Sequence, residues 1–125
     1  MSEETKRSGG CHCGAVRYDV TIPGGDNGGL GTVIECNCSI CQKRGLLLFF
    51  VQPDQFKLTA RPEGLQDYLF NKKQIHHVFC PTCGIESYAI GKTPTGAEMV
   101  AVNARCLDDV DVASLTTRPF DGRKL

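Results

Sequence analysis

Residues 79–85 of the chain read Phe-Cys-Pro-Thr-Cys-Gly-Ile, a C-x-x-C-G motif between two apolar residues that can continue strands. In such a turn backbone N–H groups point at the two sulfurs, and Gly84 can adopt the positive φ that closes the turn. The motif is therefore predicted at the tip of a hairpin. A redox C-x-x-C usually opens a helix, so this context favours a zinc knuckle over a redox pair.

The other cysteines supply the ligands that a knuckle lacks, since structural zinc takes four. Cys11 and Cys13 form a C-x-C pair, and a second C-x-C-x-x-C cluster lies in the central part of the chain. Spacing alone permits two of the central cysteines to complete the knuckle, but a compact cluster can also reach one ion as a unit. We expect a quartet (Cys11, Cys13, Cys80 and Cys83) and a trio (Cys36, Cys38 and Cys41), each holding one zinc ion.

Composition favours thiols over disulfides and argues against some classes of partner. The N-terminal residues are polar and lack the apolar core of a signal peptide, so we expect a reducing, cytoplasmic location. C-x-C cysteines also make poor disulfide partners on steric grounds. The formal net charge is zero, with 14 basic and 14 acidic residues, so we expect no nucleic-acid partner and no anionic membrane partner. The longest apolar run has the length of a strand, far below the ~18 residues of a membrane span.

The hydrophobic pattern predicts an all-β domain of short, mainly antiparallel strands. Residues 15–22 alternate, with Val16, Tyr18, Val20 and Ile22 on one face, which is typical of a half-buried strand. Residues 46–51 are continuously apolar, which predicts a strand buried on both faces. Further strands are expected at 32–35, 56–59, 65–70, 75–79, 85–90 and 98–103, and a helical turn at 110–115. We expect residues 1–8 to be a disordered leader and residues 9–125 to form a single zinc-binding domain.

The trio has a chemistry of its own because it is one ligand short of a closed zinc site. Three thiolates on Zn²⁺ leave a net charge of about −1, and their donation weakens the ion as a Lewis acid. Such a site suits the capture of a fourth thiolate and its presentation as a nucleophile better than it suits hydrolysis. The competing interpretation is that His12, His77, Cys106 or a water fills the fourth position and the site is structural.

These motifs together resemble one family. The segments C-x-C-G-x-V at 11–16, C-x-C-S-x-C-x-K at 36–43 and F-C-x-x-C-G at 79–84 resemble the glutathione-dependent formaldehyde-activating enzymes and centromere protein V. The resemblance extends to residues 103–108 and 119–122. The segment 42–47 and His77 look more like the centromere protein V branch.

The resemblance implies a zinc-bound β fold of the Mss4-like type. It implies that the quartet holds a structural zinc and the trio a catalytic zinc. It also implies the family's carbon–sulfur lyase reaction, in which glutathione and formaldehyde give S-(hydroxymethyl)glutathione.

Several residues are candidates for contacts with such a thiol. Glutathione carries two carboxylates, and Lys43 and Arg44 directly follow the trio, so they are predicted to contact them. Arg105 and Arg123 are more distant candidates. Each of these cations has the alternative of being an ordinary solvated charge.

His77 is a candidate for proton transfer to the alkoxide that forms when a thiolate adds to an aldehyde. The alternative is a buried, hydrogen-bonded strand residue. His76, on the opposite face, is expected to be exposed, and Cys106 is expected to be a small buried apolar residue.

Our leading hypothesis is therefore a zinc enzyme that adds a thiol, such as glutathione, to formaldehyde or another small aldehyde. The alternative is a non-catalytic, zinc-stapled interaction module with exposed apolar surface around residues 46–50. A thiol or metal carrier is a third possibility.

Overall fold

The computed structural model describes residues 5–22, 29–69, 75–93 and 95–122, and within them short β-strands predominate. In chain order the strands are β1 (Thr5–Gly10), β2 (Arg17–Ile22), β3 (Val33–Cys36), β4 (Leu47–Val51), β5 (Phe56–Ala60), β6 (Gln66–Tyr68), β7 (His76–Phe79), β8 (Glu86–Lys92), β9 (Glu98–Asn103) and β10 (Thr117–Phe120). One α-helix, α1 (Ser39–Arg44), follows β3, and 3₁₀ turns occupy η2 (Pro53–Gln55), η3 (Ala104–Cys106) and η4 (Val112–Ser114).

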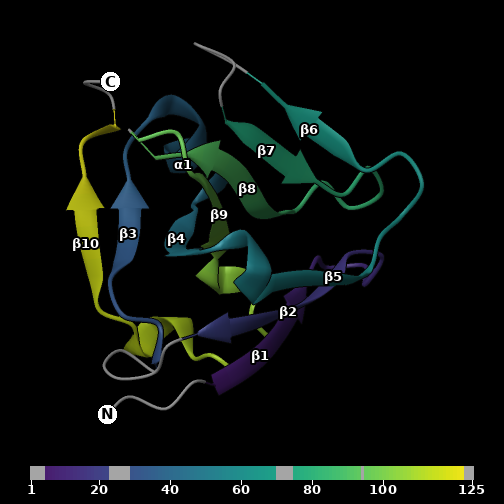
Figure 1. Ribbon diagram of the computed structural model, residues 1–125, viewed down its shortest axis with the longest axis horizontal. Helices are drawn as coiled ribbons and strands as arrows, with labels where there is room; N and C mark the ends of the chain where they lie inside the picture. The colour runs from purple at the N-terminus through teal and green to yellow at the C-terminus, as the bar shows by residue number, and fades with distance from the viewer. Residues whose placement is uncertain (1–4, 23–28, 70–74, 94, 123–125) are drawn as a thin grey trace.

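The strands form two sheets, which Figure 1 shows. A three-stranded sheet has the order β1-β2-β5, and a seven-stranded sheet has the order β10-β3-β4-β9-β8-β7-β6. The neighbouring strands pair antiparallel, apart from β10, which runs parallel to β3. The prediction of a mainly antiparallel all-β fold is confirmed.

The main core lies between the two sheets. The predicted face of β2 is confirmed, because Val16, Tyr18, Val20 and Ile22 are at most 1% exposed. They pack with apolar side chains from β3, β4, β7, β8 and β9 of the larger sheet. The ring of Phe56 links the two sheets, since it contacts Tyr18 at a centroid distance of 4.9 Å and Tyr88 at 4.7 Å.

A second, smaller core lies on the other face of the larger sheet, beneath α1. It contains Cys41, Leu46, Leu48, Ala89 and Ala101. The two alanines lie on adjacent strands and present little side chain, so α1 can lie close to the sheet. This placement brings the cysteines of the trio against the face of the sheet that α1 covers.

Strand β4 contributes to both cores, as its apolar run predicts. Leu47, Phe49 and Val51 belong to the main core and Leu48 to the smaller one. The prediction is wrong at Phe50, whose side chain is 52% exposed. The second face of the sheet is covered only where α1 crosses it, and Phe50 lies beyond that cover.

The N-terminal residues depart from the expected leader. Residues 5–8 form most of β1, which pairs with β2 from Thr5↔Ile22 to Gly10↔Arg17. Backbone hydrogen bonds to a well-buried neighbour hold this polar segment, a stabilisation that composition does not reveal. Residues 1–4 lie outside the described part of the chain.

Two further elements were not foreseen, namely α1 and β10. Helix α1 is only six residues long and ends at Gly45, which has a φ of 66° and therefore a left-handed conformation that favours glycine. The predicted helical turn at residues 110–115 is confirmed as η4. No helix in the described ranges has the length and apolar character that a membrane crossing requires.

Candidate metal centres

The quartet gathers at the junction of the two sheets. Cys11 and Cys13 follow β1 of the smaller sheet, whereas Cys80 and Cys83 lie between β7 and β8 of the larger one. The four sulfurs lie within 4.8 Å of one another. The Sγ atoms of Cys11 and Cys13, and those of Cys13 and Cys80, are 3.6 Å apart. Tetrahedral zinc with Zn–S bonds of about 2.3 Å places its sulfurs about 3.8 Å apart, so this donor set fits the ion.

The knuckle at Cys80–Gly84 has the predicted hairpin geometry. The amide of Cys80 donates to the carbonyl of Ile85 at 3.1 Å, and the amide of Gly84 donates to the carbonyl of Cys80 at 2.9 Å. Gly84 has a φ of 79°, as the sequence predicts. The amides of Cys83 and Thr82 lower the pKa of the Cys80 thiol below its ordinary value. The turn thus favours the thiolate form that binds metal.

The trio gathers where β3 passes into α1. Cys36 ends β3, Cys38 is the N-cap of α1, and Cys41 is a buried residue of the helix. Their three sulfurs also lie within 4.8 Å of one another. The amide of Cys38 donates to the Cys36 sulfur at 3.4 Å. In the described part of the chain, no further His, Cys, Asp or Glu ligand atom joins this group.

The three thiols of the trio differ in acidity. Burial raises the pKa of Cys36 and of Cys41. Burial also acts to raise the pKa of Cys38, but hydrogen bonds from the backbone and thiol of Cys41 bring it below its ordinary value. Cys38 is therefore the first of the three to become a thiolate. The other two must lose their protons when a metal binds.

The C-terminal strand covers one side of the trio. The amide of Asn37 donates to the carbonyl of Phe120 at 3.1 Å, and its side-chain Nδ2 donates to Asp121 Oδ1 at 3.1 Å. Gly122 is buried against the trio. A Cβ atom at Gly122 would overlap the sulfur of Cys36, so the close approach requires glycine here.

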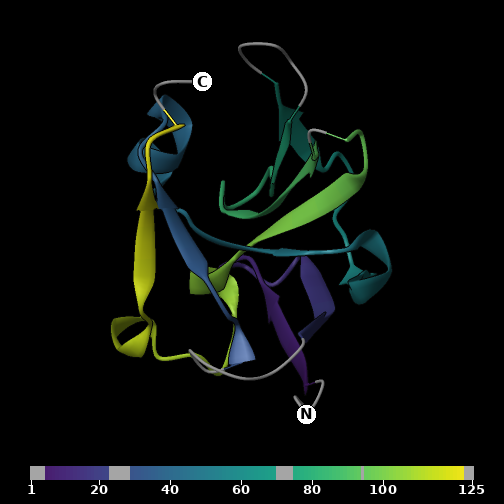
Figure 2. The same cartoon turned by 60° about the vertical axis from the view of Figure 1, so that its left-hand side comes forward.

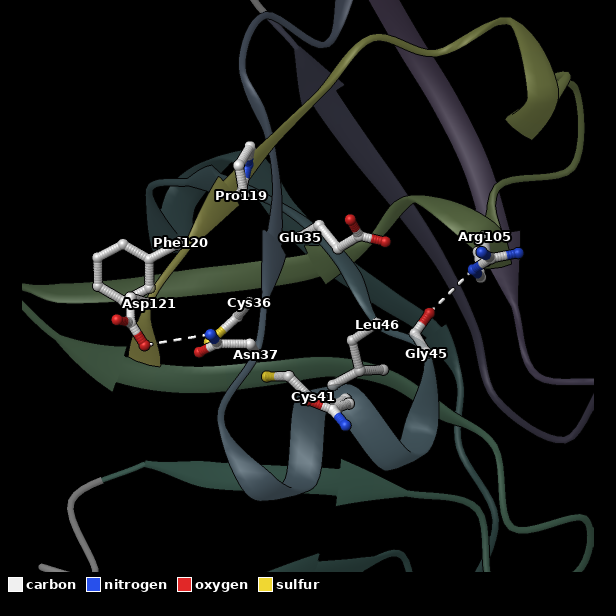
Figure 3. Close-up of a pocket in the computed structure, with 11 residues that line it drawn as sticks. Glu35, Cys36, Asn37, Cys41, Gly45, Leu46, Arg105, Pro119, Phe120 and Asp121 are labelled. Carbon is white, nitrogen blue, oxygen red and sulfur yellow. Dashed lines mark hydrogen bonds between the residues drawn. The ribbon is translucent and has the colours of Figure 1, made fainter. Parts of the chain in front are cut away.

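A pocket of about 560 Å³ opens beside the trio, and Figure 3 shows its lining. This volume lies within the range of ligand pockets, about 300–1,000 Å³. Two cysteines of the trio, Cys36 and Cys41, line this pocket. Its lining comes from β3, α1, the segment after α1, η3 and the end of β10 (Glu35, Cys36, Asn37, Cys41, Gln42, Gly45, Leu46, Arg105, Pro119, Phe120 and Asp121).

The predicted cations separate into two groups. Lys43 and Arg44 line a smaller depression of about 300 Å³ on a different face of α1. The Arg44 guanidinium pairs with Glu86 at 2.5 Å and lies 5.2 Å from the centroid of the Phe79 ring. Arg105, by contrast, lines the pocket beside the trio. Arg123 lies outside the described residues.

The three histidines differ in their exposure to solvent. His77 is 4% exposed and hydrogen-bonds through Nδ1 to Glu86 at 2.9 Å, so it is a buried, hydrogen-bonded strand residue. It pairs directly with Ala89 and therefore faces the α1 side of the sheet. His76 is exposed, as expected, and contacts Asp67 at 2.6 Å. His12 is also exposed.

Cys106 lies outside both metal centres. Its sulfur is 3.8 Å from the Glu86 carbonyl oxygen, and burial raises the pKa of its thiol to about 11. All eight cysteines are unpaired in this structure.

Sequence reasoning missed Glu35, Asn37, Asp121 and Gly122 as neighbours of the trio. Asp121 and Gly122 lie in the segment 119–122, to which the family resemblance extends. The resemblance does not say which residues they contact. Only the parallel pairing of β10 with β3 brings them to the trio.

Two comparisons with known proteins agree with this arrangement. A sequence model described as glutathione-dependent formaldehyde-activating enzyme matches residues 6–120, a span that includes both cysteine clusters. The crystal structure of a Rhodobacter sphaeroides protein is similar, with 29% sequence identity and a TM-score of 0.75 over 90% of this chain and 97% of that chain. The match over nearly the whole sequence shows that this chain belongs to the family of glutathione-dependent formaldehyde-activating enzymes.

Proposed function

We propose that this protein adds a thiol, with glutathione as the leading candidate, to formaldehyde or another small aldehyde at the trio. The observation that carries the proposal is the pocket that opens directly onto Cys36 and Cys41. Three converging sulfurs with a cavity beside them provide both a metal site and room for a further ligand. The family match supports the same class of reaction.

The residues of the trio fit zinc, because three thiolates within bonding reach of one point are ligands that this soft ion prefers. When bound, zinc would hold a substrate sulfur as a thiolate near neutral pH. The quartet, with a full set of four sulfurs, fits a closed structural site. We therefore propose two zinc ions per chain, a structural ion in the quartet and a catalytic ion in the trio.

The proposed reaction joins two molecules without loss of atoms. The substrate thiol gives up its proton, and its sulfur attacks the carbonyl carbon of the aldehyde. A carbon–sulfur bond forms while the carbonyl π electrons move to oxygen, and that oxygen then takes a proton to give the S-hydroxymethyl adduct. The chain's contribution is to hold the thiol in the pocket and to bring the two reactants together.

His77 remains our candidate for the final proton transfer. Its Nδ1 is engaged by the buried carboxylate of Glu86, which orients the imidazole ring. Lys43 and Arg44 remain predicted contacts for a substrate carboxylate.

The Cys38→Ala variant tests the proposal. Cys38 lies in the trio and not in the quartet, so we expect it to bind one zinc ion fewer, to keep its fold and to lose adduct formation by more than about a hundredfold. Zinc content, circular dichroism and an NMR assay of S-hydroxymethylglutathione would measure these three properties.

Cys106→Ala is the matched control, because that thiol is partly buried and lies outside both cysteine groups. It should keep both zinc ions and full activity. If Cys38→Ala instead unfolds the protein, the trio is structural and the proposed chemistry is wrong.

The non-catalytic module has less support in the structure. Exposed apolar surface at residues 46–50 would favour a protein partner. In that segment Phe50 is 52% exposed, whereas Leu46, Leu47, Leu48 and Phe49 are at most 8% exposed. Two zinc ions that resist chelation equally would favour the module over the enzyme.

A further inference from the structure

The pocket beside the trio has a charged end that the proposed chemistry does not use. Figure 3 shows Arg105 across the pocket from Asp121 and Cys36, and it shows the Glu35 carboxylate on the side of β3 that faces Arg105. Arg105 and Glu35 are 70 residues apart in sequence. Only the tertiary structure brings them to one cavity with the trio.

Arg105 is held in place at both its backbone and its side chain. Its amide donates to Asn103 Oδ1 at 3.1 Å, and Asn103 is a buried residue whose Nδ2 donates to the Glu86 carbonyl at 3.1 Å. Its Nε donates to the carbonyl of Gly45 at 2.9 Å. These contacts leave the two terminal guanidinium nitrogens without a carboxylate partner among the described residues. The fork is therefore oriented before any ligand arrives.

Glu35 supplies the opposite charge. It lies in β3 between Leu47 of β4 and Pro119 of β10, so its backbone is held on both sides. Its side chain is exposed and forms no ion pair with any described residue. A guanidinium and a carboxylate thus line one pocket without pairing with each other.

A separated pair of opposite charges matches a ligand that carries both charges. An α-amino acid head group has an ammonium and a carboxylate on one carbon atom. The arginine fork binds carboxylates in bidentate fashion, and a carboxylate accepts hydrogen bonds from an ammonium. The trio at the other side of the pocket suits a soft sulfur atom.

We propose that Arg105 and Glu35 recognise the α-amino-carboxylate end of the thiol substrate, with Arg105 binding its carboxylate and Glu35 its ammonium. This inference rests on the proposed function, since it takes the substrate sulfur to lie at the trio. It defines the substrate class as thiols with an amino acid head group remote from sulfur, as in a γ-glutamyl thiol. A simple alkyl thiol has neither group, so it leaves the charges of Arg105 and Glu35 without partners and binds more weakly than a γ-glutamyl thiol.

The test measures thiol binding without turnover. Co²⁺ replaces zinc in the full chain, because zinc has a filled d shell and gives no visible absorption. Three probes are titrated while the visible spectrum is followed: glutathione, glutathione acetylated on its amino group, and 2-mercaptoethanol. We expect glutathione to bind most tightly, and acetylation to weaken it by about tenfold, because acetylation removes the charge that Glu35 binds.

Substitutions assign the two contacts. Arg105→Ala should weaken glutathione binding by about tenfold or more and leave 2-mercaptoethanol unchanged. Glu35→Gln should make glutathione and its acetylated form bind alike. Arg61→Ala and Glu63→Gln change exposed charges outside the pocket and should change nothing. Lys43 lies on the other face of α1 and is the contact that the sequence predicts for a substrate carboxylate. Lys43→Ala should weaken glutathione binding less than Arg105→Ala does.

Three results would overturn the inference. The first is equal binding of glutathione and its acetylated form by the unsubstituted protein, a result that does not depend on how any variant folds. The second is unchanged glutathione binding by Arg105→Ala. The third is that Arg105→Ala weakens 2-mercaptoethanol as much as glutathione, which would indicate a general loosening of the pocket. If no thiol alters the cobalt spectrum of any protein, the proposed function fails and the inference with it.

Discussion

Individual glycines and cysteines decide how close the C-terminal segment can come to the trio. Gly122 lies where a side chain would collide with the sulfur of Cys36 and approach Cys38 Cβ at 3.0 Å. The pairing of β10 with β3 holds the segment before Gly122 beside the trio. The absence of one side chain therefore permits the close approach of the C-terminal segment to the trio.

Gly122→Ala should consequently weaken metal binding at the trio. Overpacking in a tight site costs about 1–3 kcal/mol, which corresponds to at least about a fivefold loss of zinc affinity. Competition with a chromogenic chelator would measure the affinity of each site, and the quartet should be unaffected. Gly91→Ala is the matched control, because its Cβ would make only an ordinary 3.4 Å contact with Ile75. Equal zinc affinities in the two variants would contradict the prediction.

At the scale of elements, a buried network ties α1 to the β7–β8 hairpin. The carboxylate of Glu86 is 1% exposed and bonds Arg44 of α1 through one oxygen and His77 of β7 through the other. A buried charge is tolerated only when its partners are present. The network fixes α1, which contains Cys41 and has Cys38 as its N-cap, against the sheet.

Arg44→Ala should therefore destabilise the fold by about 2 kcal/mol, since it leaves the Glu86 carboxylate with one partner fewer. Glu86→Gln in the same background should restore part of the loss, because it removes the buried charge. Urea unfolding would give the free energies. Lys43→Ala, one residue away and exposed, should change stability by less than about 0.5 kcal/mol. Strictly additive effects of the Arg44 and Glu86 substitutions would refute the coupling.

At the scale of the whole molecule, the quartet joins the two sheets. Cys11 and Cys13 belong to the end of the three-stranded sheet, and Cys80 and Cys83 to the seven-stranded one. Figure 2, turned from the view of Figure 1, shows the purple strands β1 and β2 below β4 and β9 of the larger sheet. The trio, in contrast, lies on the far side of the larger sheet and spans only β3 and α1. Metal loss at the two sites should have different consequences.

A titration with chelator should therefore show two phases. The zinc of the trio should leave first with the circular dichroism spectrum retained, because its loss opens only a local site. The zinc of the quartet should leave with unfolding, since metal binding there contributes directly to folding free energy. Cys38→Ala should lack the first phase, and Cys80→Ser should be unfolded or strongly destabilised. Release of both ions in a single step together with unfolding would contradict this division.

The fold class and the two cysteine groups could be predicted from the sequence because both depend on local spacing. A C-x-x-C-G motif closes its own turn, and alternating apolar residues in β2 determine which face is buried. The division into quartet and trio agrees with the structure, although spacing alone left another combination open. Residues 5–8 were misassigned, because a polar strand is held by its neighbour and not by its own side chains.

The sequence by itself determined the cysteine motifs, the hairpin knuckle and the β character, since each is specified within a few neighbouring residues. Only the tertiary structure decided the contents of the pocket. Arg105, Glu35 and Asp121 come from three distant segments, and their meeting depends on the parallel pairing of β10 with β3 and on the position of η3. Such long-range pairing leaves no periodic signal in the chain, because its register is set by packing against other strands.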